Sequence, residues 1–262
     1  MQELLAGLDI GTTSVKAIVM TVQGHELGIG RAPMKWSRSG RGVETSPAAI
    51  VDSALEALGI AIGVALGGHE DLRVVSIGVS SMGESGVLVD SAGSPLGPVI
   101  AWHDSRDLAE VEDLASAIGP DEFSLRTGLP FRSQWSLTKH RWLRDNVPSV
   151  ARAVRRFSIA EWVVHRLGGA PATELSLASR TGWLDLASCT PWAEALEWSG
   201  ASGVGLGELV SAGTPLGRVP NDHDLPSIRG ATLTVAGHDH QAAAIGAGAV
   251  GDGDELDSCG TA

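Results

Sequence analysis

Apolar and polar residues at the start of the chain alternate in a way that is typical of β-structure. Apolar runs occupy residues 4–10 and 15–22, and the turn residues Gly-Thr-Thr-Ser separate them. A third run, at 26–34, follows the turn Gln-Gly-His. Two β-like runs joined by a tight Gly-Thr turn predict a hairpin rather than a strand-to-helix crossover.

A helix is predicted to begin at Ser46-Pro47, because serine is a favoured N-cap and proline a favoured first helical residue. The apolar residues that follow keep a helical spacing, at positions 50, 51, 54, 55, 58, 62 and 65.

Strand-like and helical patterns continue to alternate along the rest of the chain, which has no fixed-period repeat and no linker rich enough to divide it. This alternation predicts an α/β fold with a mixed sheet that opens on hairpins. We expect strands at 72–80, 86–90, 97–102 and 232–237, a helix at 106–119 that ends at Gly119-Pro120, mainly helix over 133–167, and an alanine-rich helix after residue 237.

The composition indicates a folded, soluble protein. Hydrophobic residues make up 43% of the 262 residues, and the net charge of −12 argues against nucleic acid as the main partner. The start of the chain has no basic segment typical of a signal peptide, and the longest apolar stretch, at 60–68, is too short to span a bilayer. The two cysteines, Cys189 and Cys259, form no disulfide framework. We therefore expect a cytoplasmic protein with no membrane partner.

The last residues, Asp-Ser-Cys-Gly-Thr-Ala, have the pattern of a strand that runs into a Gly-Thr loop. Domains usually close on a docked helix or strand, so this ending predicts that the chain is a fragment.

The segment at 8–16, Leu-Asp-Ile-Gly-Thr-Thr-Ser-Val-Lys, carries the strongest local signal for a ligand. Its turn offers backbone N–H groups and hydroxyls to an anion, Asp9 can hold a hydrated Mg²⁺, and Lys16 can reach a phosphate. A plain hairpin turn explains the glycine and the serine equally well. A second Gly-Thr loop, Cys259-Gly260-Thr261, shifts the balance toward phosphate binding.

The glycines Gly246, Gly248 and Gly251 match G-x-G-x-x-G, the pattern of dinucleotide-binding loops. They end an alanine-rich helical run instead of following a strand, so the pattern fails its structural context. We interpret these glycines as helix termination or close packing.

Polar residues follow two further predicted strands. Glu84 lies in a tight loop between two strands, and Asp104 and Arg106 come just after another. Open α/β sheets bind ligands at strand ends, although a solvated loop is the simpler explanation for any one of these residues.

Three His-Asp pairs raise the alternative of a metal-dependent phosphohydrolase. They are His103-Asp104, His223-Asp224 and His238-Asp239. They occur at strand ends and in a loop, whereas ligand pairs of this kind usually belong to helices of one bundle. Adjacent strand residues also point to opposite faces, which argues against two ligands from one pair.

Asp239 itself follows Gly237 and opens the last helix. It can be a simple N-cap, or an ionised carboxylate that accepts a hydroxyl proton, and the two roles are compatible.

Together these segments resemble the FGGY carbohydrate kinases, the family of glycerol kinase and xylulokinase. The resemblance is collinear over residues 4–262. Its blocks are LDIGTTSVKAIVM, SIGVSSMGESGVLVDSAGSPLGPVIAWHDSR, TGLPFRSQWSLTKHRWL, TELSLASRTGWLDL, AGHDHQAAAIGAGAV and DSCGTA.

The resemblance implies an actin-like, ribonuclease-H-like domain with a mixed sheet flanked by helices. It implies ATP and Mg²⁺ as cofactors and a sugar or polyol as substrate, bound between two such domains. Asp239 is then the general base and Asp9 binds Mg²⁺ through water. The residues near the ATP phosphates would be Gly11, Thr12, Thr13, Lys16, Gly260 and Thr261, and those near the substrate would be Gly83, Glu84, Asp104, Gln134 and His240.

Three further expectations follow from the resemblance. Gly83 departs from glycerol kinase, which has an arginine there, and this argues against glycerol as the substrate. His238 is expected to be a packing residue. Residues 1–262 are expected to form the N-terminal domain alone, without the adenosine-binding domain, and therefore to turn over little or nothing. A non-catalytic sugar-binding module and a homodimer remain open alternatives.

Overall fold

The computed structural model describes residues 2–40, 42–67 and 72–257 of the chain. Its centre is a six-stranded mixed sheet in the order β14-β15-β6-β1-β2-β3. β6 pairs in parallel with both β1 and β15, and the other pairings are antiparallel. The strands are β1 (Gln2–Ile10), β2 (Ser14–Thr21), β3 (Glu26–Pro33), β6 (Leu72–Ser81), β14 (Pro215–Arg218) and β15 (Thr232–His238). The predicted opening hairpins and mixed sheet are confirmed.

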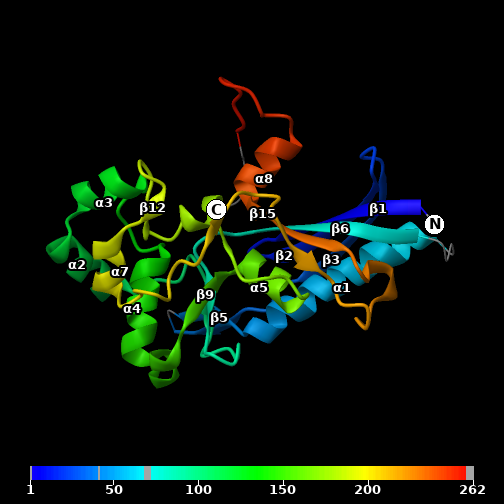
Figure 1. Cartoon of the computed structure of the whole chain (residues 1–262). Helices are drawn as coiled ribbons and strands as arrows, with labels where there is room; N and C mark the ends of the chain where they lie inside the picture. The colour runs from blue at the N-terminus through cyan, green and yellow to red at the C-terminus, as the bar shows by residue number, and fades with distance from the viewer. Residues whose placement is uncertain (1, 41, 68–71, 258–262) are drawn as a thin grey trace.

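The helix α1 (Pro47–Leu66) covers one face of this sheet (Figure 1). It begins as predicted: the Ser46 side chain accepts a hydrogen bond from the Ala49 N–H, and Pro47 is the first helical residue. α5 (Ile159–Arg166) packs beside α1 against β6 and β15. α8 (Asp239–Gly246) rises on the opposite side of the sheet (Figure 1).

α1 is long and apolar enough, with a mean hydropathy of 1.9, to meet the length and composition of a membrane span. In this fold its apolar residues serve the core instead, since Ile50, Ala54, Leu58 and Ile62 are buried together with the inner face of the sheet.

Close contact between α1 and β3 depends on two glycines. A Cβ on Gly30 would collide with the carbonyl oxygen of Ala57, and a Cβ on Gly28 would collide with that of Ala61. The missing side chains let the helix backbone lie directly on the strand.

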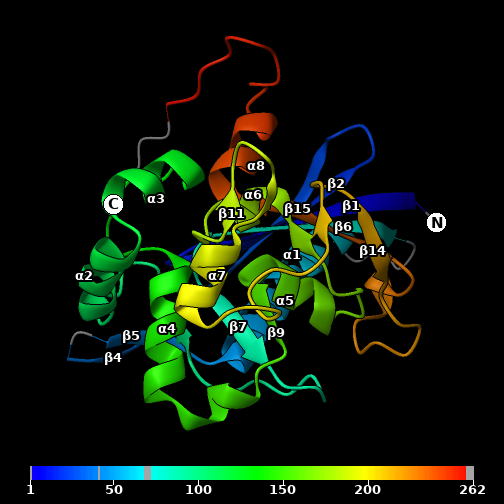
Figure 2. The same ribbon diagram turned by 60° about the vertical axis from the view of Figure 1, so that its left-hand side comes forward.

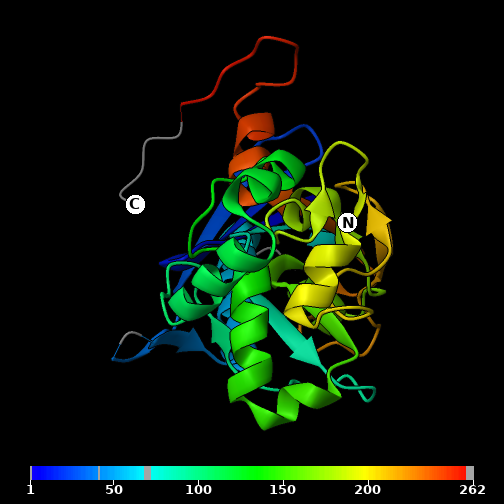
Figure 3. The ribbon, with the colours of Figure 1, turned by 90° about the vertical axis from the view of Figure 1, so that its left-hand side faces the viewer.

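A second group of elements lies at one end of the sheet and comes toward the viewer in Figure 2 and Figure 3. Its apolar core includes Phe123, Trp135 and Trp183, which are fully buried. Its helices are α2 (Leu108–Ala117), α3 (Pro120–Thr127), α4 (Ser136–Asn146) and α7 (Ala193–Ser199), and a 3₁₀ helix at Pro148–Arg152 contacts α4. The short helix α6 (Leu175–Ala178) and the 3₁₀ helix at Pro226–Ile228 pack on the central sheet instead, against β15 and β6.

The remaining strands form four small sheets outside the central one. β7 (Gly86–Val89) pairs with β9 (Arg155–Ser158), and β8 (Val99–Ile100) pairs with β5 (Gly42–Thr45). The others are β4 (Ser37–Ser39), β10 (Thr173–Glu174), β11 (Leu184–Asp185), β12 (Thr190–Pro191) and β13 (Leu209–Val210).

Several predicted elements differ from the structure. The strand expected at 97–102 covers only Val99–Ile100, and the helical stretch at 133–167 contains the strand β9. The helix expected at 106–119 is shorter and stops before Gly119, whose φ of 92° is unfavourable for other residues. Residues 254–257 form no strand, and Cys259, Gly260 and Thr261 lie outside the described residues.

We predict that Gly30→Ala lowers the free energy of unfolding by about 1–3 kcal/mol or more, because the added methyl group forces α1 away from β3. Gly59→Ala is the matched control. Gly59 lies within α1 and a Cβ there meets no atom within 4 Å, so this change should stabilise the protein by up to about 1 kcal/mol. Urea unfolding of both variants measures the difference, and equal stability would contradict the packing argument.

Candidate active site

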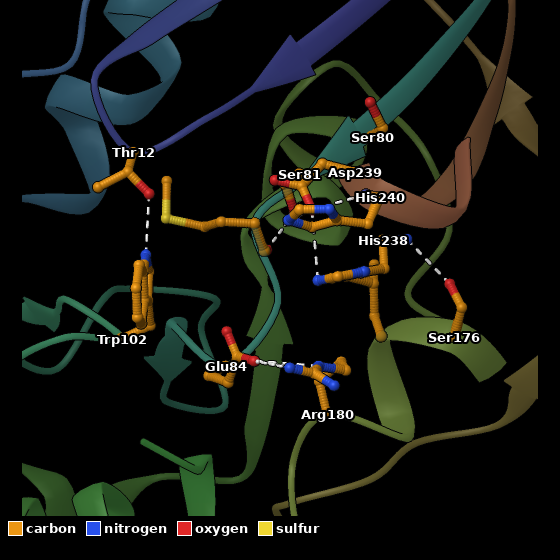
Figure 4. A network of polar contacts seen from close by, with 12 residues as sticks. Thr12, Ser80, Ser81, Glu84, Trp102, Ser176, Arg180, His238, Asp239 and His240 are labelled. Carbon is orange, nitrogen blue, oxygen red and sulfur yellow. Dashed lines mark hydrogen bonds and ion pairs between the residues drawn. The ribbon is translucent and has the colours of Figure 1, made fainter. Parts of the chain in front are cut away.

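The site forms where the parallel strands β1, β6 and β15 end at the same edge of the sheet. Asp9 near the end of β1 is paired in register with Ser80 of β6, and His238 at the end of β15 is paired with Ser81. Asp239 follows directly as the first residue of α8 (Figure 4). Parallel topology thus brings residues from distant parts of the sequence together, as the rule for ligand sites in α/β sheets predicts.

A groove of about 630 Å³ lies on the sheet face opposite α1. Asp9, Lys16, Asp239 and His240 line it together, so four of the predicted site residues share one surface. Its floor includes the small residues Gly7, Gly78 and Ala236. Lys16 Nζ lies 3.4 Å from Asp9 Oδ2 across the β1–β2 hairpin.

The Asp239 carboxylate is partly buried at the groove wall. Burial raises its pKa above the ordinary aspartate value, while the His240 N–H and the charges of His240, Arg180 and Lys16 act in the opposite direction. Its Oδ1 accepts a hydrogen bond of 2.8 Å from the His240 N–H. The N-cap interpretation is wrong, because the cap residue is His238 and Asp239 is already inside the helix.

The two flanking histidines differ in environment. His238 Nε2 lies 3.3 Å from Asp239 Oδ1, and burial lowers the pKa of His238 to about 4, so its ring is neutral at pH 7. His240 stacks on His238 with ring centroids 5.3 Å apart and is largely exposed. His238 is therefore a buried packing residue, as expected, and His240 faces the groove.

The His-Asp pairs do not assemble a metal centre from described residues. Across residues 2–40, 42–67 and 72–257, no three His, Cys, Asp or Glu side chains lie close enough to hold one ion. This arrangement gives the phosphohydrolase hypothesis no geometric support.

Glu84 lies in the loop between β6 and β7 with its side chain 4% exposed. Its Oε1 accepts hydrogen bonds from Arg180 Nε and Nη2 at 3.0 and 2.8 Å (Figure 4). The same oxygen accepts a hydrogen bond of 3.2 Å from Gln134 Nε2. Burial raises the pKa of Glu84, and Arg180 opposes that rise. The structure thus brings Glu84 and Gln134 into direct contact.

Arg180 is a site residue that the sequence reasoning did not single out. It also occupies the space beside Gly83, where a Cβ would lie 3.0 Å from Arg180 Cβ and Cγ and 3.1 Å from His238 Cδ2. Position 83 therefore has no room for a larger side chain unless these neighbours move. The local sequence, Ala-Ser-Arg-Thr, gives no sign of the contact because its partners lie about a hundred residues earlier.

Asp104 makes its contacts away from this groove. Its carboxylate is fully buried and accepts hydrogen bonds from the Arg106 side chain and the Val43 N–H. These contacts lower the pKa of Asp104 despite its burial. Asp104 fixes the loop after β8 to β5 in this structure.

The Gly-Thr loop at 11–13 is largely bonded to the protein itself. The Gly11 N–H donates to the Ser14 carbonyl, and the Thr13 carbonyl accepts from the Met34 N–H. The Thr12 hydroxyl accepts from Trp102 Nε1 at 2.8 Å (Figure 4). The loop is therefore a well-formed hairpin turn next to the groove, and only some of its polar groups remain for a ligand.

A short relay fixes the end of β15 just before Asp239. The His238 N–H donates to Ser176 Oγ at 2.9 Å (Figure 4). That hydroxyl in turn donates to the Glu174 carboxylate. Gly237, the residue before His238, adopts a φ of 103°. A Cβ on Gly237 would lie 2.6 Å from Ser176 Oγ. The relay therefore sets the point from which α8 and its aspartate start.

We predict that Ser176→Ala speeds hydrogen exchange at the His238 amide and lowers the free energy of unfolding by about 1 kcal/mol, because the His238 N–H loses its acceptor at this partly buried junction. Ser116→Ala, on the exposed surface of α2, should change stability by less than about 0.5 kcal/mol. Amide hydrogen exchange measured by NMR compares the Ser176→Ala and Ser116→Ala variants with the wild type. Unchanged protection at His238 in the Ser176 variant would argue against the relay.

Comparison with known proteins identifies the fold and the family. The sequence profile of the N-terminal domain of the FGGY family of carbohydrate kinases matches residues 4–246 of this chain. The chain is 32% identical to the xylulose kinase of Streptomyces rubiginosus over 98% of this chain and 53% of that protein. It is 30% identical to the glycerol kinase of Leifsonia xyli over 100% of this chain and 53% of that protein. The chain thus spans about half the length of the curated relatives it matches.

Solved structures show the same fold. The xylulose kinase from Rhodospirillum rubrum matches with a TM-score of 0.87 at 26% identity, over 95% of this chain and 52% of that one. The glycerol kinase of Plasmodium falciparum, solved with ADP, also gives 0.87, at 21% identity and over 97% and 52% of the two chains. The expected α/β fold with a mixed sheet flanked by helices is that of an actin-like ATPase domain. By its family match over most of its length, the chain belongs to the FGGY family of carbohydrate kinases.

Proposed function

We propose that this chain is the N-terminal, substrate-binding domain of a cytoplasmic kinase that transfers a phosphoryl group from ATP to a hydroxyl of a sugar or polyol. The observation that carries the proposal is the shared groove in which Asp239 stands beside Asp9 and Lys16, with Glu84 behind it. The family match and the xylulose and glycerol kinases among its relatives support this assignment.

Asp239 acts as the general base in this proposal. Phosphoryl transfer has a loose transition state, so the protein contributes mainly by positioning the hydroxyl and stabilising charge. Burial raises the pKa of this carboxylate, which favours acceptance of the proton late in the reaction. Glu84 and Gln134 hold the substrate through its other hydroxyls, and His240 lies at the groove wall next to the base.

The groove residues fit a magnesium–nucleotide complex. Asp9 offers the carboxylate oxygens that Mg²⁺ prefers, and its side chain is 38% exposed in the groove. Lys16, also exposed there, would neutralise phosphate oxygens, and the turn at Gly11, Thr12 and Thr13 lies beside them. When bound, this complex supplies the phosphoryl group to be transferred. Gly260 and Thr261, outside the described residues, are proposed to extend the same phosphate site.

We predict that Asp239→Asn lowers the rate of ATP-dependent phosphorylation about 10²–10⁴-fold, because the amide cannot accept the hydroxyl proton. The assay uses this chain fused to the C-terminal half of the Streptomyces rubiginosus xylulose kinase, with pentuloses, hexuloses and polyols as candidate substrates. Asp224→Asn, on an exposed loop, is the matched control and should leave the rate unchanged. Unchanged phosphorylation in the Asp239 variant would remove the base assignment.

We also predict that the 262-residue chain alone shows little or no phosphorylation. We propose that the adenosine-binding residues belong to a second domain, because the matched relatives are about twice as long as this chain. The same assay, run with and without the added C-terminal half, measures this. Full activity in the 262-residue chain would contradict the two-domain proposal. A fused protein that binds a sugar but transfers no phosphoryl group would instead support the non-catalytic module.

A further inference from the structure

Arg180 occupies a fixed position between Glu84 and a buried aromatic ring. Two of its nitrogens, Nε and Nη2, donate to the same carboxylate oxygen, Oε1 of Glu84. The guanidinium carbon lies 4.9 Å from the centre of the Trp135 ring. Trp135 is itself held by a hydrogen bond of 2.9 Å from its Nε1 to the Pro130 carbonyl. The arginine therefore lies against a rigid support and cannot easily turn away from Glu84.

The two oxygens of Glu84 are used unequally. Gln134 also donates to Oε1, so this oxygen receives all three side-chain hydrogen bonds that the described part of the chain directs to the carboxylate. Oε2 receives none of them. Because a carboxylate oxygen is a strong acceptor, Oε2 is the atom left to bind a substrate hydroxyl.

Charge around Glu84 also depends on Arg180. The positive charges that face this carboxylate are those of Arg180, Arg156 and Lys139, and the negative one is that of Asp239. His140 lines the same small cavity as Glu84, but burial lowers its pKa to about 4, so it is neutral. Arg180 is the positively charged side chain that bonds directly to the carboxylate of Glu84.

We propose that Arg180 is a positioning and specificity-determining residue, which holds Glu84 with Oε2 free for a hydroxyl and so selects neutral polyhydroxy compounds over sugar acids. The inference rests on the proposed function, because it concerns the substrate of that same site. A sugar acid would bring its carboxylate toward Glu84 and Asp239 while the nearest guanidinium is already paired. Like charges at this distance disfavour binding.

The first test needs no catalysis. Carboxyl ¹³C NMR of the 262-residue chain follows the titration of Glu84 in the wild type, Arg180→Lys and Arg180→Met. We expect the pKa of Glu84 to rise by about 1 or more in the methionine variant and by less in the lysine variant, which keeps the charge. Arg132→Met is the matched control, since Arg132 also lies over the Trp135 ring, at 5.6 Å, and forms no described ion pair with Glu84. An unchanged Glu84 titration in Arg180→Met would overturn the positioning role.

The second test addresses specificity. Saturation-transfer NMR with the fused two-domain protein compares xylulose and glycerol, which are neutral, with gluconate. We expect the wild type to bind a neutral compound and not gluconate, and Arg180→Met to bind the neutral compound about 10-fold more weakly, with partial recovery in Arg180→Lys. Gluconate binding that is lost in Arg180→Met would make the arginine an anion receptor and overturn the specificity assignment.

The two tests separate the inference from the proposed function. If no sugar or polyol binds while Glu84 titrates as expected, the proposed function and the specificity assignment both fail, and the positioning of Glu84 by Arg180 stands. If a neutral compound binds equally well to the wild type and Arg180→Met, only the specificity assignment fails.

Discussion

The parallel pairing of β6 with both β1 and β15 is the constraint on which the rest of the site depends. Three strands that run in one direction must all end at one edge, so Asp9, Ser80 and His238 meet there although more than two hundred residues separate the first from the last. α8 then begins within one residue of that edge and carries Asp239 over the groove. α1 packs on the opposite face, where Gly28 and Gly30 let it approach the sheet closely. The helix therefore stabilises the sheet without covering the groove on its other face.

The second constraint is electrostatic. Glu84 and Asp239 are both partly or fully shielded from water, and the charge of Asp239 contributes to the raised pKa of Glu84. Burial raises the pKa of both carboxylates. A positive charge nearby opposes this rise at each of them. Arg180 supplies it from the segment that follows α6, and Ser176, four residues earlier, fixes the strand end before Asp239. One short stretch of chain thus supports both carboxylates.

The sequence predicted those parts of the fold that depend on neighbouring residues. Local residue spacing is enough to predict the hairpin turns, the Ser46-Pro47 start of α1 and the strand before Asp239. All of these elements are present in the structure. The pairing of β7 with β9 was missed because β9 is four residues long and lies inside a helical pattern. Asp104 shows that the sequence alone does not reveal whether a polar side chain is already bonded within the protein. Its place after a strand suggested a ligand contact, but only the structure shows that Arg106 and Val43 already engage its carboxylate.

The groove combines an open sheet surface with charged side chains at its rim. Its floor includes residues with little or no side chain, Gly7, Gly78 and Ala236, and its rim carries Asp9, Lys16 and Asp239. Small residues expose the backbone, so a bulky ligand can lie directly against the sheet, while the charged rim sets which groups it presents and where. A single domain with such an open face can orient two reacting groups but cannot exclude water from them. Closure by a second domain would remove that water and strengthen every charge interaction at the rim. In the proposed kinase, the described residues would orient the reacting groups, and a partner surface over the same groove would exclude water from them.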